Sequence, residues 1–142
     1  MRYAKDVVWV FPSSTAPRWR SAVTIVASAV PIPLSDPQGV DPEEAFVAAL
    51  SSCHMLWFLF FAAKRGFTVD SYRDDAVGLM GKNAEGRTAM TKVTLRPVMH
   101  FSGGQVADPE QISQMHDEAH HACFIANSVR TLVTVEDSGS AV

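Results

Sequence analysis

Residues 41–66 read DPEEAFVAALSSCHMLWFLFFAAKRG and decide the fold. Asp41 is placed to accept hydrogen bonds from the first free N–H groups of a helix, Pro42 suits the first helical position, and Glu44 completes a capping box. Two basic residues and then Gly66 follow the apolar run, which is typical of a helix end. We therefore predict one helix of about 24 residues, roughly 36 Å long.

This predicted helix is apolar on almost every side. It is about long enough to span a bilayer, but the polar run Ser51 to His54 interrupts it and no second span follows, so a buried helix is the better interpretation. A helix that is apolar all round must be covered all round, and a domain of this size cannot enclose it alone. We therefore expect a homodimer in which these helices are central.

The rest of the chain predicts strands and one further helix around it. Periodicity and turn residues predict an α+β fold in a single domain, residues 1–142, with antiparallel sheet packed on two helices. The expected elements are strands within Met1 to Pro33, strands at Phe67–Lys82 and Arg87–Phe101 with an edge or bulge at Pro97, a helix from Asp108 to about Ala126, and a strand at Val129–Glu136.

Composition excludes several classes of protein. The net charge is −3 and no basic run occurs, which argues against nucleic acid as a partner. Two cysteines in 142 residues cannot build a disulfide-rich secreted scaffold, so a cytoplasmic location is expected. The run Ser21 to Pro33 resembles a signal peptide only superficially, because it starts too far from the N-terminus. No membrane partner is expected.

The two cysteines, Cys53 and Cys123, have two interpretations. Both could be small buried hydrophobic residues. Alternatively they could form a redox pair, which requires a cation or hydrogen-bond donor to keep one thiol ionised. Arg18, Arg20 and His54 are candidate cations, together with the histidines of the second helix. The sequence alone leaves both interpretations open.

Glu43 is a candidate for holding such an arginine in place. It precedes Cys53 by ten residues, about 15 Å along one helix, so it cannot contact that cysteine within the same straight helix. Glu43 would therefore serve the cysteine of a neighbouring protomer or act through an intervening side chain.

A metal site is a third hypothesis. His116, His120 and Cys123 fall on one stripe of the second helix and are plausible zinc ligands. The histidine spacing does not match the HExxH protease motif, and no CxxC knuckle occurs. The alternative is a half-exposed helix face with solvated histidines, and no resident metal is predicted.

Two segments carry a family resemblance. Residues 41–54 (DPEEAFVAALSSCH) resemble the nucleophile helix of the OsmC/Ohr family of osmotically inducible, hydroperoxide-reducing proteins, and residues 120–129 (HHACFIANSV) resemble its second-cysteine motif. The resemblance covers roughly residues 34–137. It implies an intertwined homodimer with central helices wrapped by sheet and two active sites at the subunit boundary.

The resemblance also implies a reaction. Cys53 would attack an organic hydroperoxide and become a sulfenic acid, and Cys123 would condense with it to a disulfide. An external dithiol, such as a lipoylated protein or a small thiol, would restore the pair without a bound cofactor. Glu43 matches the family glutamate, and Arg18 or Arg20 could fill the role of the activating arginine. Cys123 is followed by phenylalanine, where the peroxidase subgroups typically have proline.

We thus expect a thiol-dependent peroxidase that acts in oxidative stress defence. Apolar walls would favour organic peroxides over hydrogen peroxide; the expected wall residues are Phe46, Met55, Leu56 and Trp57. The alternative is a binding protein that holds an apolar ligand in the same dimer cleft without turnover.

Overall fold

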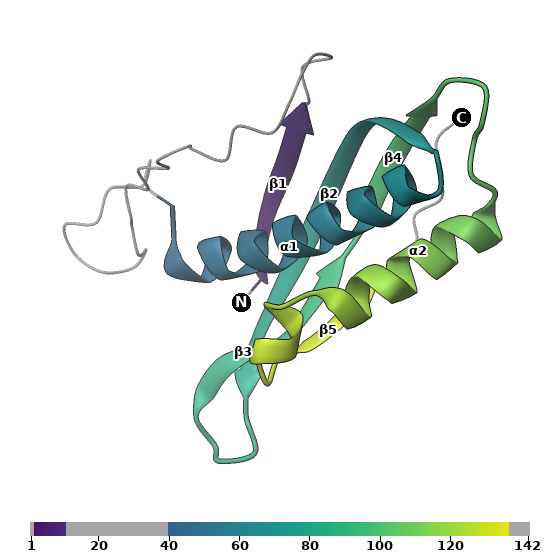
Figure 1. The fold of residues 1–142 in the computed structure, drawn as a ribbon. Coiled ribbons are helices and arrows are strands. Elements are labelled where there is room, and N and C mark those ends of the chain that lie inside the picture. The colour runs from purple at the N-terminus through teal and green to yellow at the C-terminus, as the bar shows by residue number, and fades with distance from the viewer. Residues whose placement is uncertain (1, 11–39, 137–142) are drawn as a thin grey trace.

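The computed structural model of the chain describes residues 2–10 and 40–136. Its elements in chain order are β1 (Arg2–Val10), α1 (Pro42–Lys64), β2 (Thr68–Lys82), β3 (Thr88–Leu95), β4 (Pro97–Ser102), α2 (Pro109–Ala122), the short 3₁₀ helix η1 (Ala126–Ser128) and β5 (Leu132–Val135). Two α-helices with a sheet of five described strands confirm the predicted α+β class (Figure 1).

The long strand β2 organises the sheet. It pairs with β1 along one edge, while β4 and β3 share its other edge, β4 beside residues 68–74 and β3 beside residues 77–82. These pairings are all antiparallel, but β5 runs parallel to β3. The expectation of wholly antiparallel sheet was therefore wrong in this part, because the connection through α2 returns the chain in the direction of β3.

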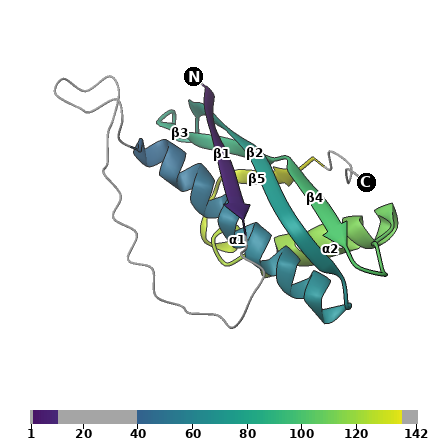
Figure 2. The same cartoon turned by 90° about the horizontal axis from the view of Figure 1, so that it is seen from above.

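Both helices lie on one face of the sheet (Figures 1 and 2). The side chains of β2 alternate accordingly, with Tyr72, Asp74 and Ala76 buried and the intervening Arg73 and Asp75 exposed. Two apolar clusters result, one between the second half of α1, α2 and the sheet, and one between the first half of α1 and strands β2, β3 and β5. The core thus follows the length of α1.

Local sequence signals fix both ends of α1. Asp41 accepts a hydrogen bond from the N–H of Glu43 at 2.8 Å, and the capping box with Glu44 is present. At the other end Gly66 has a φ of 81°, and the N–H of Phe67 donates to the carbonyl of Ala62 at 3.0 Å, which closes the last turn. The predicted boundaries of this helix are confirmed.

The predicted strand Arg87–Phe101 is two strands that separate at Arg96. The carboxylate of Asp74, which is fully buried, accepts the Arg96 N–H at 2.6 Å and the Ser51 hydroxyl at 2.5 Å. Burial raises the pKa of Asp74. Pro97 opens β4, a position where its missing N–H costs nothing. The disruption expected at this proline is therefore a complete strand break, stabilised by a buried acid.

The C-terminal elements are shorter than predicted. The second helix ends at Ala122 rather than near Ala126, and Cys123 is its C-cap with extended backbone, so this cysteine is not inside the helix. The last strand covers four residues, Leu132–Val135. Of the strands predicted within Met1 to Pro33, β1 lies in the described part and residues 11–33 lie outside it.

α1 is not fully covered by residues 2–10 and 40–136, which the structure describes. Length and composition alone would allow it to cross a membrane, yet it packs against the sheet and α2. Leu56 and Phe60, which are one turn apart, are 47% and 53% exposed. The described part of the chain therefore leaves an apolar stripe of this helix open.

The close approach of β2 to α1 yields a stability prediction. A Cβ atom at Gly78 would lie 2.7 Å from both Val47 Cγ2 and Met90 Sδ, too close for either to stay in place. We expect Gly78→Ala to lower the free energy of unfolding by about 1–3 kcal/mol, measured by urea denaturation. Gly104→Ala is the matched control, because nothing lies within 4 Å of its added Cβ. Equal stability of the two variants would contradict this packing.

Candidate functional site

The fold brings together the two cysteines, which are 70 positions apart in the sequence. Cys53 lies in the middle of α1 and is half-buried, whereas Cys123 caps α2 and is 1% exposed. Both are free thiols, and the Cys53 side chain is near enough to the Cys123 thiol to raise its pKa. The two thiols are therefore neighbours in the fold, which a redox pair requires.

The two thiols have unequal surroundings. The pKa of Cys123 is raised to about 11, mainly by burial and further by the neighbouring Cys53 side chain. The N–H of Ala126, 3.4 Å from Cys123 Sγ, acts in the opposite direction. Cys123 is therefore a protonated thiol at neutral pH, while Cys53 is the more accessible sulfur of the pair.

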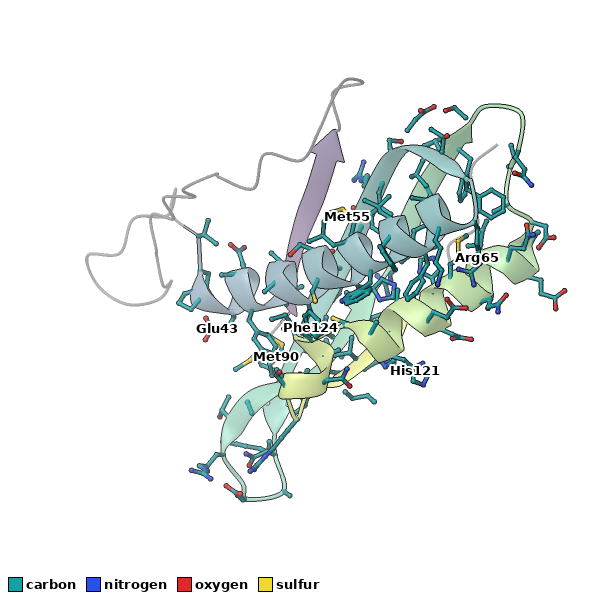
Figure 3. The ribbon with its side chains drawn as sticks, in the orientation of Figure 1. Glu43, Met55, Arg65, Met90, His121 and Phe124 are labelled. Carbon is teal, nitrogen blue, oxygen red and sulfur yellow. The ribbon has the colours of Figure 1, made fainter. Side chains whose placement is uncertain are left out.

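The turn that carries Cys123 is firmly held. Asn127 donates its backbone N–H to the Cys123 carbonyl at 3.0 Å and its side-chain amide to the His121 carbonyl at 2.9 Å. The Ser128 hydroxyl donates to the Phe124 carbonyl at 2.7 Å. Figure 3 shows Phe124 below the middle of α1, where the end of α2 approaches that helix. The position of Cys123 is thus set by hydrogen bonds to its own carbonyl and to the backbone carbonyls on both sides of it.

A buried histidine pair lies beside the cysteines. His54 Nε2 is 2.9 Å from His116 Nδ1, and the two nearly parallel rings are 1% and 4% exposed. Phe58 stacks on His116 with ring centroids 4.4 Å apart. The pair joins α1 to α2 within a mostly apolar layer. Sequence reasoning missed it, although a histidine at each of two buried helix positions was a usable signal.

His54 does not supply positive charge to Cys53. Its pKa is lowered to about 3, mainly by burial and further by the adjacent His116 and His120. One ring of the pair donates and the other accepts in the bond between His54 Nε2 and His116 Nδ1. The candidate cation predicted next to the nucleophile is therefore a neutral imidazole, and this role was wrongly expected of it.

The proposed metal ligands do not converge. His116 faces His54, and Cys123 faces Cys53. Within residues 2–10 and 40–136, no three histidine, cysteine or acidic side chains come together as a metal-binding group. The described geometry thus gives the metal hypothesis no support.

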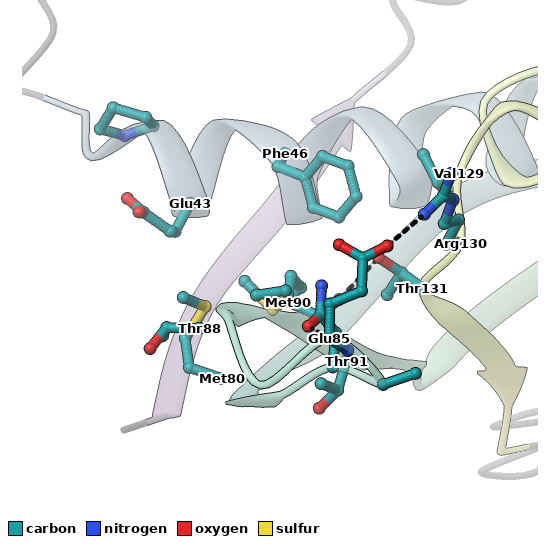
Figure 4. A pocket seen from close by; sticks show the side chains of 14 residues that line it. Glu43, Phe46, Met80, Glu85, Thr88, Met90, Thr91, Val129, Arg130 and Thr131 are labelled. Carbon is teal, nitrogen blue, oxygen red and sulfur yellow. Dashed lines mark hydrogen bonds and ion pairs between the residues drawn. The ribbon is translucent and has the colours of Figure 1, made fainter.

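Glu43 lies in the first turn of α1, on the rim of an open groove of about 760 Å³. Figure 4 shows it with Phe46 above the β2–β3 hairpin, near Met80 and Met90. A hydrogen bond between the two carboxyl groups raises the pKa of Glu43 and lowers that of Asp41. Neither cysteine lines this groove, which agrees with the expectation that Glu43 does not reach Cys53 of its own chain.

The remaining site residues are placed as follows. Arg18 and Arg20 lie outside the described residues. Of the expected apolar walls, Met55 is buried in the core and Phe46 lines the groove near Glu43. Trp57 and Leu56 lie one turn beyond Cys53 on α1, and Leu56 is exposed. Of the four predicted wall residues, Trp57 and Leu56 are therefore the two near the cysteine pair.

The fold and site together define an α+β protein in which a central helix and the cap of a second helix present two neighbouring thiols. The chain belongs to the OsmC-like protein family, whose model matches residues 35–137. No functionally curated protein matches the sequence.

Solved structures of this family share the fold. An OsmC-like protein of unknown function from Vibrio cholerae is 44% identical, with 96% of this chain and 98% of that chain covered and a TM-score of 0.77. An OsmC-like protein from Mycoplasma pneumoniae is 14% identical over 99% and 98% of the chains, TM-score 0.69. The organic hydroperoxide resistance protein OhrB of Bacillus subtilis is 20% identical over 70% and 71%, TM-score 0.59.

The buried histidine yields a pH prediction. His54 stays neutral in the folded chain down to about pH 3 but takes up a proton near pH 6.5 once unfolded. Between these pH values the unfolded chain therefore holds one more proton on His54 than the folded chain. The contribution of His54 to the free energy of unfolding falls as the pH is lowered from 6.5 toward 3, by at most about 1.4 kcal/mol per pH unit. Urea denaturation at pH 7, 6, 5 and 4 measures this dependence.

His54→Gln is the control, since it keeps a hydrogen-bonding side chain but does not titrate. We expect its unfolding free energy to depend less steeply on pH than that of the wild type. Asp74, which titrates with the opposite sign because burial raises its pKa, is present in both proteins and cancels in the difference. If the unfolding free energies of the wild type and the variant depend on pH equally steeply, His54 is not held neutral in the folded chain.

Proposed function

We propose that this protein is a thiol-dependent peroxidase that reduces organic hydroperoxides to alcohols and contributes to peroxide resistance. Membership of the OsmC-like family and the likeness of fold to organic hydroperoxide resistance proteins support a role of this kind. The observation that carries the proposal is the contact between an accessible Cys53 and a buried, protonated Cys123. A two-cysteine reaction needs one sulfur that the peroxide can reach and a second sulfur that does not react with the peroxide itself.

In the first step the Cys53 thiolate attacks the terminal oxygen of the hydroperoxide. The O–O bond breaks as an S–O bond forms, and the alkoxide leaves and takes a proton to become the alcohol. The Cys53 sulfur is oxidised by two electrons and becomes a sulfenic acid. Because Cys123 is protonated at neutral pH, it does not compete for the peroxide.

In the second step the Cys123 sulfur attacks the sulfenic sulfur, an S–S bond forms, and water leaves with the hydroxyl group of the sulfenic acid and the thiol proton. A dithiol then reduces the disulfide by two exchanges and is itself oxidised. A lipoylated protein or a small thiol would serve as this reductant. Such reductants and free cysteines fit a cytoplasmic protein.

The proposed site is completed by a second copy of the chain. The open apolar stripe of α1 at Leu56 and Phe60 offers the surface on which two copies would join. Glu43, which is remote from Cys53 of its own chain, would then approach Cys53 of the other. Arg18 or Arg20 would supply the permanent positive charge that His54 cannot.

The reaction makes a direct prediction for the cysteines. With dihydrolipoamide as reductant, we expect the wild type to reduce tert-butyl hydroperoxide, and Cys53→Ser to fall to the uncatalysed rate because the attacking sulfur is gone. Cys123→Ser should still lose one equivalent of Cys53 thiol to peroxide but form no intramolecular disulfide. Peroxide consumption and intact-protein mass measure both outcomes.

A non-enzymatic binding protein gives the opposite result. Wild type no faster than Cys53→Ser, with both thiols unmodified after peroxide treatment, would refute the peroxidase and favour an apolar-ligand carrier. Ser52→Ala is a suitable control, because Ser52 neighbours the cysteine and its hydroxyl donates to the carbonyl of Ala49 in its own helix, at 3.2 Å. This variant should turn over at nearly the wild-type rate.

A further inference from the structure

Four aromatic rings lie together beside the two cysteines. Trp57 follows Cys53 by one helical turn and meets Phe124 edge to face, with ring centroids 5.4 Å apart and an interplanar angle of 83°. Trp57 also contacts Phe60 at 5.6 Å and Phe61 at 5.8 Å. We call Trp57, Phe60, Phe61 and Phe124 the aromatic cluster. Three of its rings lie on α1, which carries Cys53, and the fourth directly follows Cys123, the C-cap of α2.

Phe124 is the unusual member of this cluster. Its side chain is 69% exposed, the most of any large apolar residue in the described part of the chain, although it directly follows the buried Cys123. The exposure is not that of a loose loop, because the hydrogen bonds of Asn127 and Ser128 hold this turn. A fixed, exposed apolar ring beside a reactive group is typical of a ligand-binding surface.

We propose that Phe124, with Trp57 behind it, is the specificity-determining residue for the organic group of the hydroperoxide and selects aromatic over aliphatic substrates. This inference rests on the peroxidase function proposed above. One edge contact with Trp57 leaves most of the Phe124 ring free, and a second ring can join such a pair edge on or in an offset stack. An aliphatic group gains burial there but not this interaction.

The geometry favours the substrate as occupant of this surface. A peroxide oxygen that reaches Cys53 Sγ places the carbon next to it only a few bonds from the sulfur pair. Trp57 lies one turn from Cys53, Phe124 adjoins Cys123 in the sequence, and the two rings meet each other, so they are placed to contact the organic group. A surface that served only to join two copies would not need to lie beside both sulfurs.

Two substrates isolate the contribution of the ring. Cumene hydroperoxide is tert-butyl hydroperoxide with one methyl group replaced by phenyl, so the ratio of their kcat/KM values measures the gain from the phenyl group. We expect Phe124→Leu, which keeps apolar bulk, to lower kcat/KM for cumene hydroperoxide about fivefold and to change that for tert-butyl hydroperoxide less than about twofold. An unchanged ratio would overturn the proposal.

Val106→Ala is the matched control. Val106 is also a strongly exposed apolar residue, at 56%, but it precedes α2, and Cys123 lies at the other end of that helix. The substrate ratio of this variant should equal that of the wild type. A Phe124→Leu protein that loses its dimer, as seen by sedimentation, yet keeps the wild-type ratio would assign the ring to subunit contact instead.

A binding measurement separates this inference from the proposed reaction. Cys53→Ser protein is titrated with 2-phenyl-2-propanol, the alcohol product of cumene hydroperoxide, and with tert-butanol, and amide shifts are followed by NMR. We expect the aryl alcohol to bind more tightly, and Phe124→Leu in the same background to weaken it about fivefold. If peroxide turnover is absent but this difference remains, the peroxidase fails and the aryl-binding surface stands; if the difference is absent, the aryl surface fails.

Discussion

The arrangement depends on the packing of α1 against α2. Two polar contacts join these helices: the buried bond between His54 and His116, and the ion pair of Arg65 with Glu118 at 2.6 Å near the end of α1. Apolar side chains fill the layer around the histidines. Hydrogen bonds are directional, so the pair of contacts fixes how far α2 can slide or rotate along α1. The distance between Cys53 and Cys123 is set by the same register.

The histidine pair has a consequence for the chemistry of Cys53. A cysteine nucleophile is commonly paired with a histidine that takes its proton. Here the adjacent imidazole of His54 is buried in the core, is neutral, and hydrogen-bonds the imidazole of His116. Under the proposed function, an activating charge at Cys53 would come from a group other than His54, and a guanidinium, which stays protonated, meets this requirement. This reasoning favours Arg18 or Arg20 over His54 for that role.

Features set by local sequence could be predicted, and features set by distant contacts could not. The ends of α1 depend on Asp41 and Gly66, which act within one turn, and both were predictable. The break at Arg96 depends on the carboxylate of Asp74, which is 22 positions away. The alternation of apolar and polar residues continues on both sides of such a break. The sequence pattern alone therefore predicts one continuous strand. The order of elements was therefore accessible, while the split of one strand was not.

The same division applies to the site. Cys53 and Cys123 could be singled out from their flanking residues, but their contact arises from helix packing across 70 positions. The His54–His116 bond spans 62 positions and was not foreseen. The sequence did place Glu43 too far along α1 to reach Cys53, and the fold keeps that separation.

A link between assembly and activity follows under the proposed function. One chain supplies neighbouring sulfurs and an aromatic surface, but its Glu43 lies at a separate groove and its α1 keeps an open apolar stripe. If joining two copies buries that stripe, the same event brings the acid of one chain toward the sulfur of the other. Dimerisation would then assemble the group that orients the activating cation. A separated protomer would keep its thiol pair but lose the acid that positions the charge.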